Sequence, residues 1–509
     1  MKEIIKKFKE ETGYELTIKN GKLFYDGFLN LAGQNITELP DNLTVNGSIS
    51  LTDTNIDKLP NNLIVKGSLF AGYTYITEIP YSLKVEDSIF LDHTPITKLP
   101  DNLIVGEDLV LSYSSIRELP DKLSIGKNLK LSCTHISKLP DNLTVGRSLY
   151  LDDTDITELH KSLMINGNLN LANTPIEFLP DNLTVSGYLY LSGSSLKKVP
   201  NNLIVGDFLV LSNTLIKELP DNLIVGGYIA LDSTKIEELP DNLKVSDTLS
   251  LISTGIKKLP NNLTLGGSLL LSDTPITELP DNLTIYGSLV LSYTKITKLP
   301  DNLTVIGDLS LYGVNLRELP NNLTIGGKLY LHVLYIRDFS QINRNISRQH
   351  INDCENKVFF WERDGVRYIK ADGIFSVIDS HHENVYKVHK LGQQDRPFYI
   401  VTDGEGHWAH GEILAEAKAD LIYKINDRDT SAYDNLTVDD TLSYEEAIAA
   451  YRTITGACSL GTRDFIDNRL PTPHKDKYTI KEIIDLTTGE YGGEKFSKFF
   501  KKHKKEHNK

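Results

Sequence analysis

The strongest constraint in this sequence is a repeat with a period of 20 residues. A Leu-Pro pair, or a close variant of it, occurs fifteen times in register from Leu39–Pro40 to Leu319–Pro320. The register holds even at His160, where the proline of the pair is replaced. A fixed period of this length is typical of a solenoid, in which one supersecondary unit is stacked many times.

Each 20-residue unit carries apolar residues at fixed positions. From Leu43 to Leu51, alternate residues are apolar or glycine, which is the period of a β-strand. Pro40 and the Asp-Asn pair that follows it are typical of a corner, because proline fixes φ and removes a backbone donor. The sequence therefore predicts a mainly β fold, namely a parallel β-solenoid of about fifteen 20-residue coils.

The segment Leu269–Pro280, LLLSDTPITELP, resembles a leucine-rich repeat. The short period and the Leu-Pro ending are similar to the class of leucine-rich repeats found in secreted bacterial effectors, and the resemblance extends over about residues 30–340. Threonine, as at Thr54 and Thr134, stands where that family usually has a ladder asparagine. We expect its hydroxyl to bond the backbone of a neighbouring coil. With threonine at this position, the solenoid could have either of two shapes, an open horseshoe or a rounder, closed solenoid.

The sequence also predicts the division of the chain into domains. Residues 1–30 are expected to form a cap, with an amphipathic lysine-rich helix followed by a hairpin. The leucine-rich-repeat-like solenoid then covers residues 31–340, and residues 341–356 form a closing cap and linker. Residues 357–509 are predicted to form a small α+β domain with a basic tail. As a whole, the chain resembles repeat proteins carried by bacteria and their phages.

Local patterns place several elements of the α+β domain. Ser443 with Glu446, and Thr479 with Glu482, form capping boxes that predict the starts of two helices. The segment 412–425 is amphipathic and is predicted to be a helix. We expect its buried face to carry residues 413, 417 and 421.

The outward face of the strands is the candidate binding surface. The leucines of each Leu-x-Leu strand point inward, so the residues between and beside them point outward. Aromatic side chains on a rigid scaffold are common anchors of protein recognition. The candidate partner-binding residues are Phe70, Tyr73, Phe90, Tyr113, Tyr150, Tyr188, Tyr190, Phe208, Tyr228 and Tyr293. We therefore predict a scaffold that recognises a protein partner; alternatively, these aromatics only pack against one another along the sheet.

A second hypothesis is an effector-type enzyme, a thiol hydrolase or transferase, in which the repeats select the substrate. Cys458 with His407 or His410 would supply the Cys-His pair of such an enzyme. The Cys-x-Asp motif of the effector ubiquitin ligases is absent, because Ser459 and Leu460 follow Cys458. These weak catalytic candidates favour a protein that is not an enzyme. A third hypothesis, a structural or adhesin-like solenoid, would require export.

Composition limits the partners and the compartment. The net charge of −14 argues against a nucleic-acid-binding protein, although the lysine-rich tail Lys495–Lys509 could contact nucleic acid. The three cysteines are far apart, which fits a reducing compartment, and no CxxC pair accompanies the histidines. We therefore predict no metal and no cofactor.

The sequence predicts neither a membrane span nor a secretory signal. No apolar run approaches the roughly 18 residues of a spanning helix, and charges interrupt the N-terminal segment. We predict a cytoplasmic protein, and delivery into a host by a signal-independent route stays open.

Overall fold

The computed structural model describes residues 1–331, 358–425, 430–457 and 462–506, without residues 20, 102, 162, 282, 317, 464, 468–469, 471–473 and 490–491. The chain divides into two compact units, Met1–Ile346 and Ser347–Lys509, which we call the solenoid unit and the C-terminal unit. The predicted linker, residues 341–356, lies outside the described residues.

A helix and a hairpin begin the solenoid unit. Helix α1 (Lys2–Thr12) ends at a left-handed glycine, and strands β1 (Thr17–Lys19) and β2 (Lys22–Asp26) form an antiparallel pair. Strand β2 then pairs in parallel with β4 (Leu43–Asn46), so the hairpin continues directly into the coils. Phe8 of α1 is buried in the same core as the coils, whereas most other residues of α1 are exposed.

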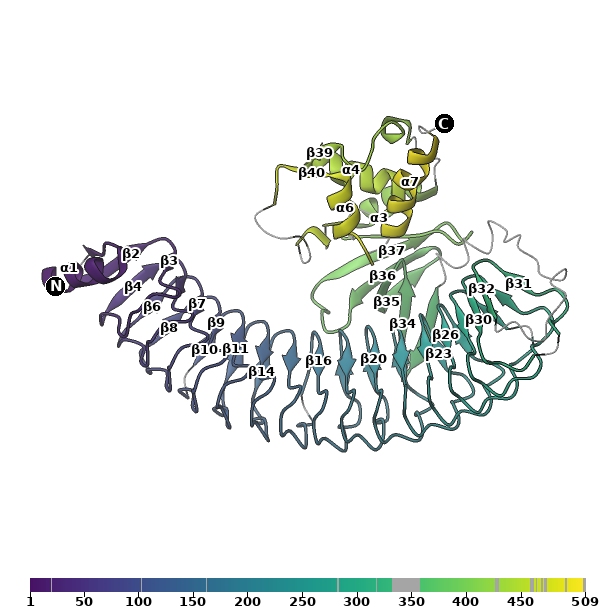
Figure 1. Ribbon diagram of the computed structural model, residues 1–509, viewed down its shortest axis with the longest axis horizontal. Coiled ribbons are helices and arrows are strands. Elements are labelled where there is room, and N and C mark those ends of the chain that lie inside the picture. The colour runs from purple at the N-terminus through teal and green to yellow at the C-terminus, as the bar shows by residue number, and fades with distance from the viewer. Residues whose placement is uncertain are drawn as a thin grey trace. The chain divides into compact units, whose positions relative to one another are not determined.

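A sixteen-stranded parallel sheet runs along the solenoid unit, whose coils stack in a curved row (Figure 1). Most strands pair with the strand 20 residues further along the chain, as Leu129 pairs with Leu149. This register explains the strict period of the sequence. The strands of this long sheet are β3 (Leu29–Asn30), β5 (Ile49–Ser50), β7 (Leu69–Phe70), β9 (Ile89–Phe90), β11 (Leu109–Val110), β13 (Leu129–Lys130), β15 (Leu149–Tyr150), β16 (Leu169–Asn170), β18 (Leu189–Tyr190), β20 (Leu209–Val210), β22 (Ile229–Ala230), β24 (Leu249–Ser250), β26 (Leu269–Leu270), β28 (Leu289–Val290), β30 (Leu309–Leu311) and β32 (Leu329–Leu331).

A second row of short parallel strands precedes the long sheet in most coils, and at Ile165 an isolated bridge takes the place of a strand. As far as Val85 this row is one sheet with the hairpin strands. Beyond Val85 it breaks into several small sheets, each of which also pairs residues 20 apart, as Val105 pairs with Ile125. The predicted parallel β-solenoid with leucine-rich-repeat-like coils is confirmed. The strands of the second row are β6 (Ile64–Val65), β8 (Lys84–Val85), β10 (Ile104–Val105), β12 (Ser124–Ile125), β14 (Thr144–Val145), β17 (Thr184–Val185), β19 (Ile204–Val205), β21 (Ile224–Val225), β23 (Lys244–Val245), β25 (Thr264–Leu265), β27 (Thr284–Ile285), β29 (Thr304–Val305) and β31 (Thr324–Ile325).

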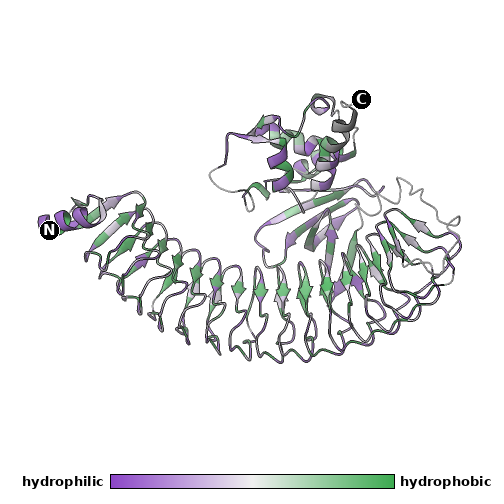
Figure 2. Cartoon of the chain, viewed as in Figure 1, coloured by the Kyte–Doolittle hydropathy of each residue, from purple (hydrophilic) through white to green (hydrophobic). Residues whose placement is uncertain are grey.

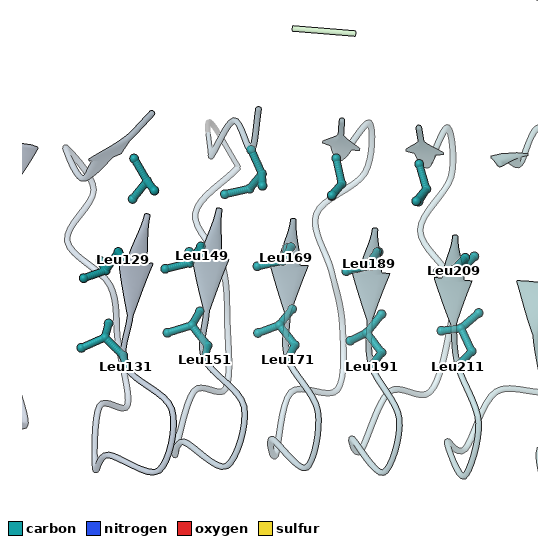
Figure 3. Close-up of a cluster of buried hydrophobic side chains, with 14 of the residues drawn as sticks. Leu129, Leu131, Leu149, Leu151, Leu169, Leu171, Leu189, Leu191, Leu209 and Leu211 are labelled. Carbon is teal, nitrogen blue, oxygen red and sulfur yellow. The ribbon is translucent and has the colours of Figure 1, made fainter. Parts of the chain in front are cut away.

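Aliphatic side chains form one continuous core through the solenoid unit. Leu149 and Leu151 are completely buried, and Figure 3 shows the equivalent pairs of five successive coils pointing to the same side of their strands. Figure 2 shows hydrophobic residues recurring along the strands, with hydrophilic residues in the turns between them. Because each leucine packs against its counterparts in neighbouring coils, a single coil has no complete core of its own.

The ladder threonines bond within their own coil. The Thr134 hydroxyl donates to the carbonyl of Leu131 at 2.6 Å, and Thr54 repeats this contact with Leu51 at the same distance. The expectation of a hydroxyl bond to a neighbouring coil is therefore wrong. Backbone bonds join the coils instead, as where Leu131 donates to the carbonyl of Tyr150 at 2.9 Å.

The C-terminal unit begins with a six-stranded antiparallel meander in which sequential strands are neighbours. Helix α3 (Leu414–Ile425) packs against the last two strands of this meander and buries Ala417 and Leu421. Ile413 precedes the helix and is 62% exposed, so its expected place on the buried face is wrong. The strands are β33 (Phe359–Arg363), β34 (Val366–Ala371), β35 (Ile374–His382), β36 (Val385–Lys390), β37 (Pro397–Thr402) and β38 (Trp408–Gly411).

Helices and a small two-stranded sheet complete the C-terminal unit, so the predicted α+β class is confirmed. Both predicted capping boxes are present, at Ser443 and at Thr479. None of the described helices is long and apolar enough to cross a bilayer. The remaining elements are η1 (Ser431–Tyr433), β39 (Thr441–Ser443), α4 (Tyr444–Thr455), β40 (Lys477–Thr479), α6 (Ile480–Leu486) and α7 (Gly493–Glu506).

Candidate functional site

A left-handed turn residue follows many strands of the long sheet. Gly33, Gly193 and Gly313 occupy this position in three coils, whereas Tyr73 and Tyr113 occupy it with φ values of 55° and 58°. A bulky residue with positive φ is uncommon, because its Cβ crowds the backbone. Backbone strain of this kind persists only where other contacts outweigh it, and it is frequent at functional sites.

Aromatic rings at this position form an exposed stack. His93 lies between Tyr73 and Tyr113, with ring centroids 4.2 and 4.5 Å apart and interplanar angles of 10° and 15°. The spacing matches the separation of adjacent strands, roughly 4.8 Å. Phe70 and Phe90, on the strands themselves, form a second stack at 4.8 Å. We call Phe70, Tyr73, Phe90, His93 and Tyr113 the N-terminal aromatic patch.

The two tyrosines of this patch keep more than half of their surface in solvent. Tyr73 is 54% exposed and Tyr113 57% exposed, while the phenylalanines are half-buried. Tyr75, which was not predicted, is 62% exposed in the turn two residues after Tyr73. The patch therefore offers broad apolar surface at a place where the backbone is fixed.

A second group of aromatics lies on the outward face further along the sheet. Tyr188, Phe208 and Tyr228 stack with centroids 4.9 and 4.8 Å apart, and all three are half-buried. Burial and the neighbouring Tyr150 raise the pKa of Tyr188. Burial and the neighbouring Tyr190 likewise raise the pKa of Tyr228. These phenols therefore remain protonated hydrogen-bond donors at neutral pH.

The structure distributes the ten predicted partner-binding residues over separate groups. Tyr150 lies beside Tyr188, and Tyr190 lies beside Tyr228. The Lys130 ammonium lies 5.4 Å from the centre of the Tyr150 ring. Tyr293 lies far along the sheet and meets Tyr312 edge to face at 5.4 Å. The aromatics thus pack against one another along the sheet, and Tyr73, Tyr113 and Tyr293 also retain accessible surface.

The two candidate catalytic histidines have different carboxylate partners. His407 Nδ1 lies 2.5 Å from Asp403 Oδ2, and His410 Nδ1 lies 2.6 Å from Asp372 Oδ2. The third catalytic candidate, Cys458, lies outside the described residues. Among the residues that the structure describes, no group of three or more His, Cys, Asp or Glu side chains could hold a metal ion.

His410 belongs to a buried charge cluster that the sequence did not reveal. Asp372 lies in the turn after β34 and contacts His410 of β38 and the Nζ of Lys424 of α3, which also donates to the Trp408 carbonyl at 2.9 Å. The side chains of these three residues are 6%, 3% and 10% exposed, respectively. Burial raises the pKa of Asp372, but Lys424 and His410 outweigh this effect, so the pKa lies below its usual value.

Comparisons with known proteins give distant structural likenesses. No protein-family model matches the sequence, and no curated protein matches it. A leucine-rich-repeat protein of Leptospira interrogans is 20% identical, with a TM-score of 0.37 over 57% of this chain and 90% of that one. The leucine-rich effector protein YopM of Yersinia pestis is 22% identical, with a TM-score of 0.34 over 58% of this chain and 89% of that one.

Proposed function

We propose that the solenoid unit is a recognition scaffold that binds a protein partner through the N-terminal aromatic patch. One observation carries the proposal: the exposed rings of Tyr73, His93 and Tyr113 stack at a left-handed backbone position that glycine occupies in some other coils. Rings held rigidly by neighbouring coils lose little conformational freedom on binding, which is an advantage for an anchor residue. Tyrosine is also enriched among the residues that dominate binding energy in protein interfaces.

The fold supports this role in a second way. The coils are joined by backbone hydrogen bonds and one shared core, so side chains on the sheet face are held in fixed columns. Extended rigid surfaces of this kind are how solenoids contact large partners. The partner contacts would then be set by the outward residues, which vary from coil to coil, and the inward leucines would serve only the scaffold.

A capture experiment with matched variants tests the proposal. Tagged wild-type protein, the double variant Tyr73→Ser/Tyr113→Ser and the control Tyr81→Ser are used to capture proteins from source-cell lysate. Tyr81 is 71% exposed but lies in a corner beside Pro80, away from the sheet strands. We expect wild type and Tyr81→Ser to capture the same partner protein in similar amounts. The double variant should capture at least tenfold less of that protein. Equal capture by all three proteins would refute the role of the patch.

A further inference from the structure

The C-terminal unit contains a cavity of about 770 Å³ at one end of its meander. In an antiparallel meander, the end of one strand lies beside the start of the next. The residues that line the cavity at this edge of the sheet are Asp372, Ile374, Lys390, Phe398 and His410. The volume lies within the range of roughly 300–1,000 Å³ that is usual for small-molecule sites. The cavity belongs to the C-terminal unit alone and is independent of the N-terminal aromatic patch.

One helix face lines the opposite wall of the cavity. Tyr444, Ala447, Ile448 and Tyr451 of α4 follow the spacing i, i+3, i+4 and i+7, which places them on the same side of the helix. Ile448 and Tyr451 are only half-buried, so part of this apolar face is not covered by the protein itself. Covering such surface with an apolar ligand is favourable, because it removes that surface from water.

Further apolar side chains extend the same wall. Phe465, Ile466 and Leu470 contribute from the segment after α4, and Leu486 contributes from α6; all four are half-buried. A ligand that fills the cavity therefore needs an apolar body.

Two of the three carboxylates that line the cavity have cationic partners. Of the lining carboxylates, Asp372 is paired with Lys424 and His410, and Glu412 lies 3.5 Å from Arg463. The third lining carboxylate, Asp467, is exposed.

Lys390 and Arg396 line the cavity between β36 and β37. No carboxylate among the described residues pairs with the Arg396 guanidinium in an ion pair, and the side chain lies in solvent. A guanidinium binds a carboxylate through two parallel hydrogen bonds.

We propose that this cavity binds an amphipathic carboxylate, with its acid group at Arg396 and its apolar body along the α4 wall. The His410 imidazole lines the same cavity as Arg396. Asp372 fixes the orientation of this ring through the 2.6 Å contact to Nδ1. The buried cluster thereby adds a fixed polar group to the lining of the cavity, in addition to the apolar α4 wall.

Calorimetric titration of the full-length protein with decanoate and with decanol tests the proposal. We expect one decanoate per chain, and weaker binding of decanol, which has the same chain without the charge. Arg396→Gln should weaken decanoate binding about tenfold and leave decanol binding unchanged, because only the charged hydrogen bonds are lost. Lys418→Gln, an exposed cation of α3 outside the cavity, should leave both affinities unchanged.

A second variant tests the apolar wall. Ile448→Trp adds volume inside the cavity and should weaken the binding of both ligands. An unchanged thermal unfolding midpoint would confirm that the variant is folded. If the midpoint falls, Ile374→Phe is used in place of Ile448→Trp. Absence of decanoate binding to the wild type would overturn the proposal. Equal affinities for decanoate and decanol, with no effect of Arg396→Gln, would equally overturn it.

Discussion

At position 73 two opposing effects act on the same tyrosine. Its left-handed backbone conformation, with φ of 55°, is strained by roughly 1 kcal/mol or more. Its ring stacks on His93 at 4.2 Å, a contact that contributes about 0.5–1.5 kcal/mol. Asparagine tolerates positive φ much better than tyrosine does, so removing the ring also removes most of the strain.

We therefore expect Tyr73→Asn to change the free energy of unfolding by less than about 1 kcal/mol. Tyr73→Val loses the same stacking and introduces a β-branched residue at positive φ, so it should be the more destabilising variant. Denaturant unfolding of both variants measures the difference. If asparagine is as destabilising as valine at this position, the backbone strain is not significant.

The ladder position offers a similar comparison between two coils. The Thr134 hydroxyl is bonded to the Leu131 carbonyl, whereas the buried Ser114 hydroxyl at the equivalent position has no hydrogen-bond partner among the residues that the structure describes. Thr134→Val should therefore cost about 1 kcal/mol of unfolding free energy, because it leaves the shape nearly unchanged and removes the hydrogen bond. Ser114→Ala should be neutral or stabilising, since the hydroxyl that it removes is unsatisfied. Equal costs for the two variants in denaturant unfolding would contradict the assignment.

At the scale of elements, the turn after β34, strand β38 and helix α3 are joined by the buried cluster. The Asp372 backbone is left-handed, with φ of 50°, and asparagine accepts that conformation, so Asp372→Asn removes the charge without straining the turn. It leaves Lys424 buried without its anion, and the expected loss of unfolding free energy is about 3–5 kcal/mol. Asp364→Asn, in an exposed hairpin turn at φ 52°, is the matched control.

The same cluster predicts a pH dependence. The folded pKa of Asp372 lies below its unfolded value, which is about 3.9. Its stabilising contribution is therefore complete above the unfolded pKa and is lost as the pH falls through the folded pKa. In unfolding experiments at several pH values, the difference between wild type and Asp372→Asn should be constant near neutrality and shrink below about pH 4. A difference that grows in acid would contradict the paired state of Asp372.

The cluster also marks the limit of what the sequence could predict at this scale. The coils follow from a period of 20, and the helix starts at Ser443 and Thr479 follow from three-residue spacings. Asp372 and Lys424 are 52 residues apart and carry no local pattern, so only the fold brings them together. The prediction of the threonine hydrogen bonds was wrong for a different reason. The carbonyl three residues earlier in the same coil competes with the backbone of the neighbouring coil as the acceptor, and residue type alone cannot decide between the two acceptors.

At the scale of the whole molecule, each unit has its own core. The hydrophobic core of the solenoid unit extends from Phe8 to Ile325, and separate clusters around Ile369, Ala417 and Ala450 belong to the C-terminal unit. Units with separate cores unfold separately unless a large interface couples them. Calorimetry of the full-length protein should therefore give two unfolding transitions, one for each unit.

Two core variants assign these transitions. Leu209→Ala removes a completely buried side chain of β20 and should cost about 2–5 kcal/mol in the solenoid unit alone. Asp372→Asn should lower only the other transition, because its partners all lie in the C-terminal unit. Each coil contacts only its neighbours, so Leu209→Ala weakens the coupling between the coils on its two sides. The unfolding transition of the solenoid unit should therefore also be broader in this variant. If either variant shifts both transitions together, the two units fold as one cooperative body.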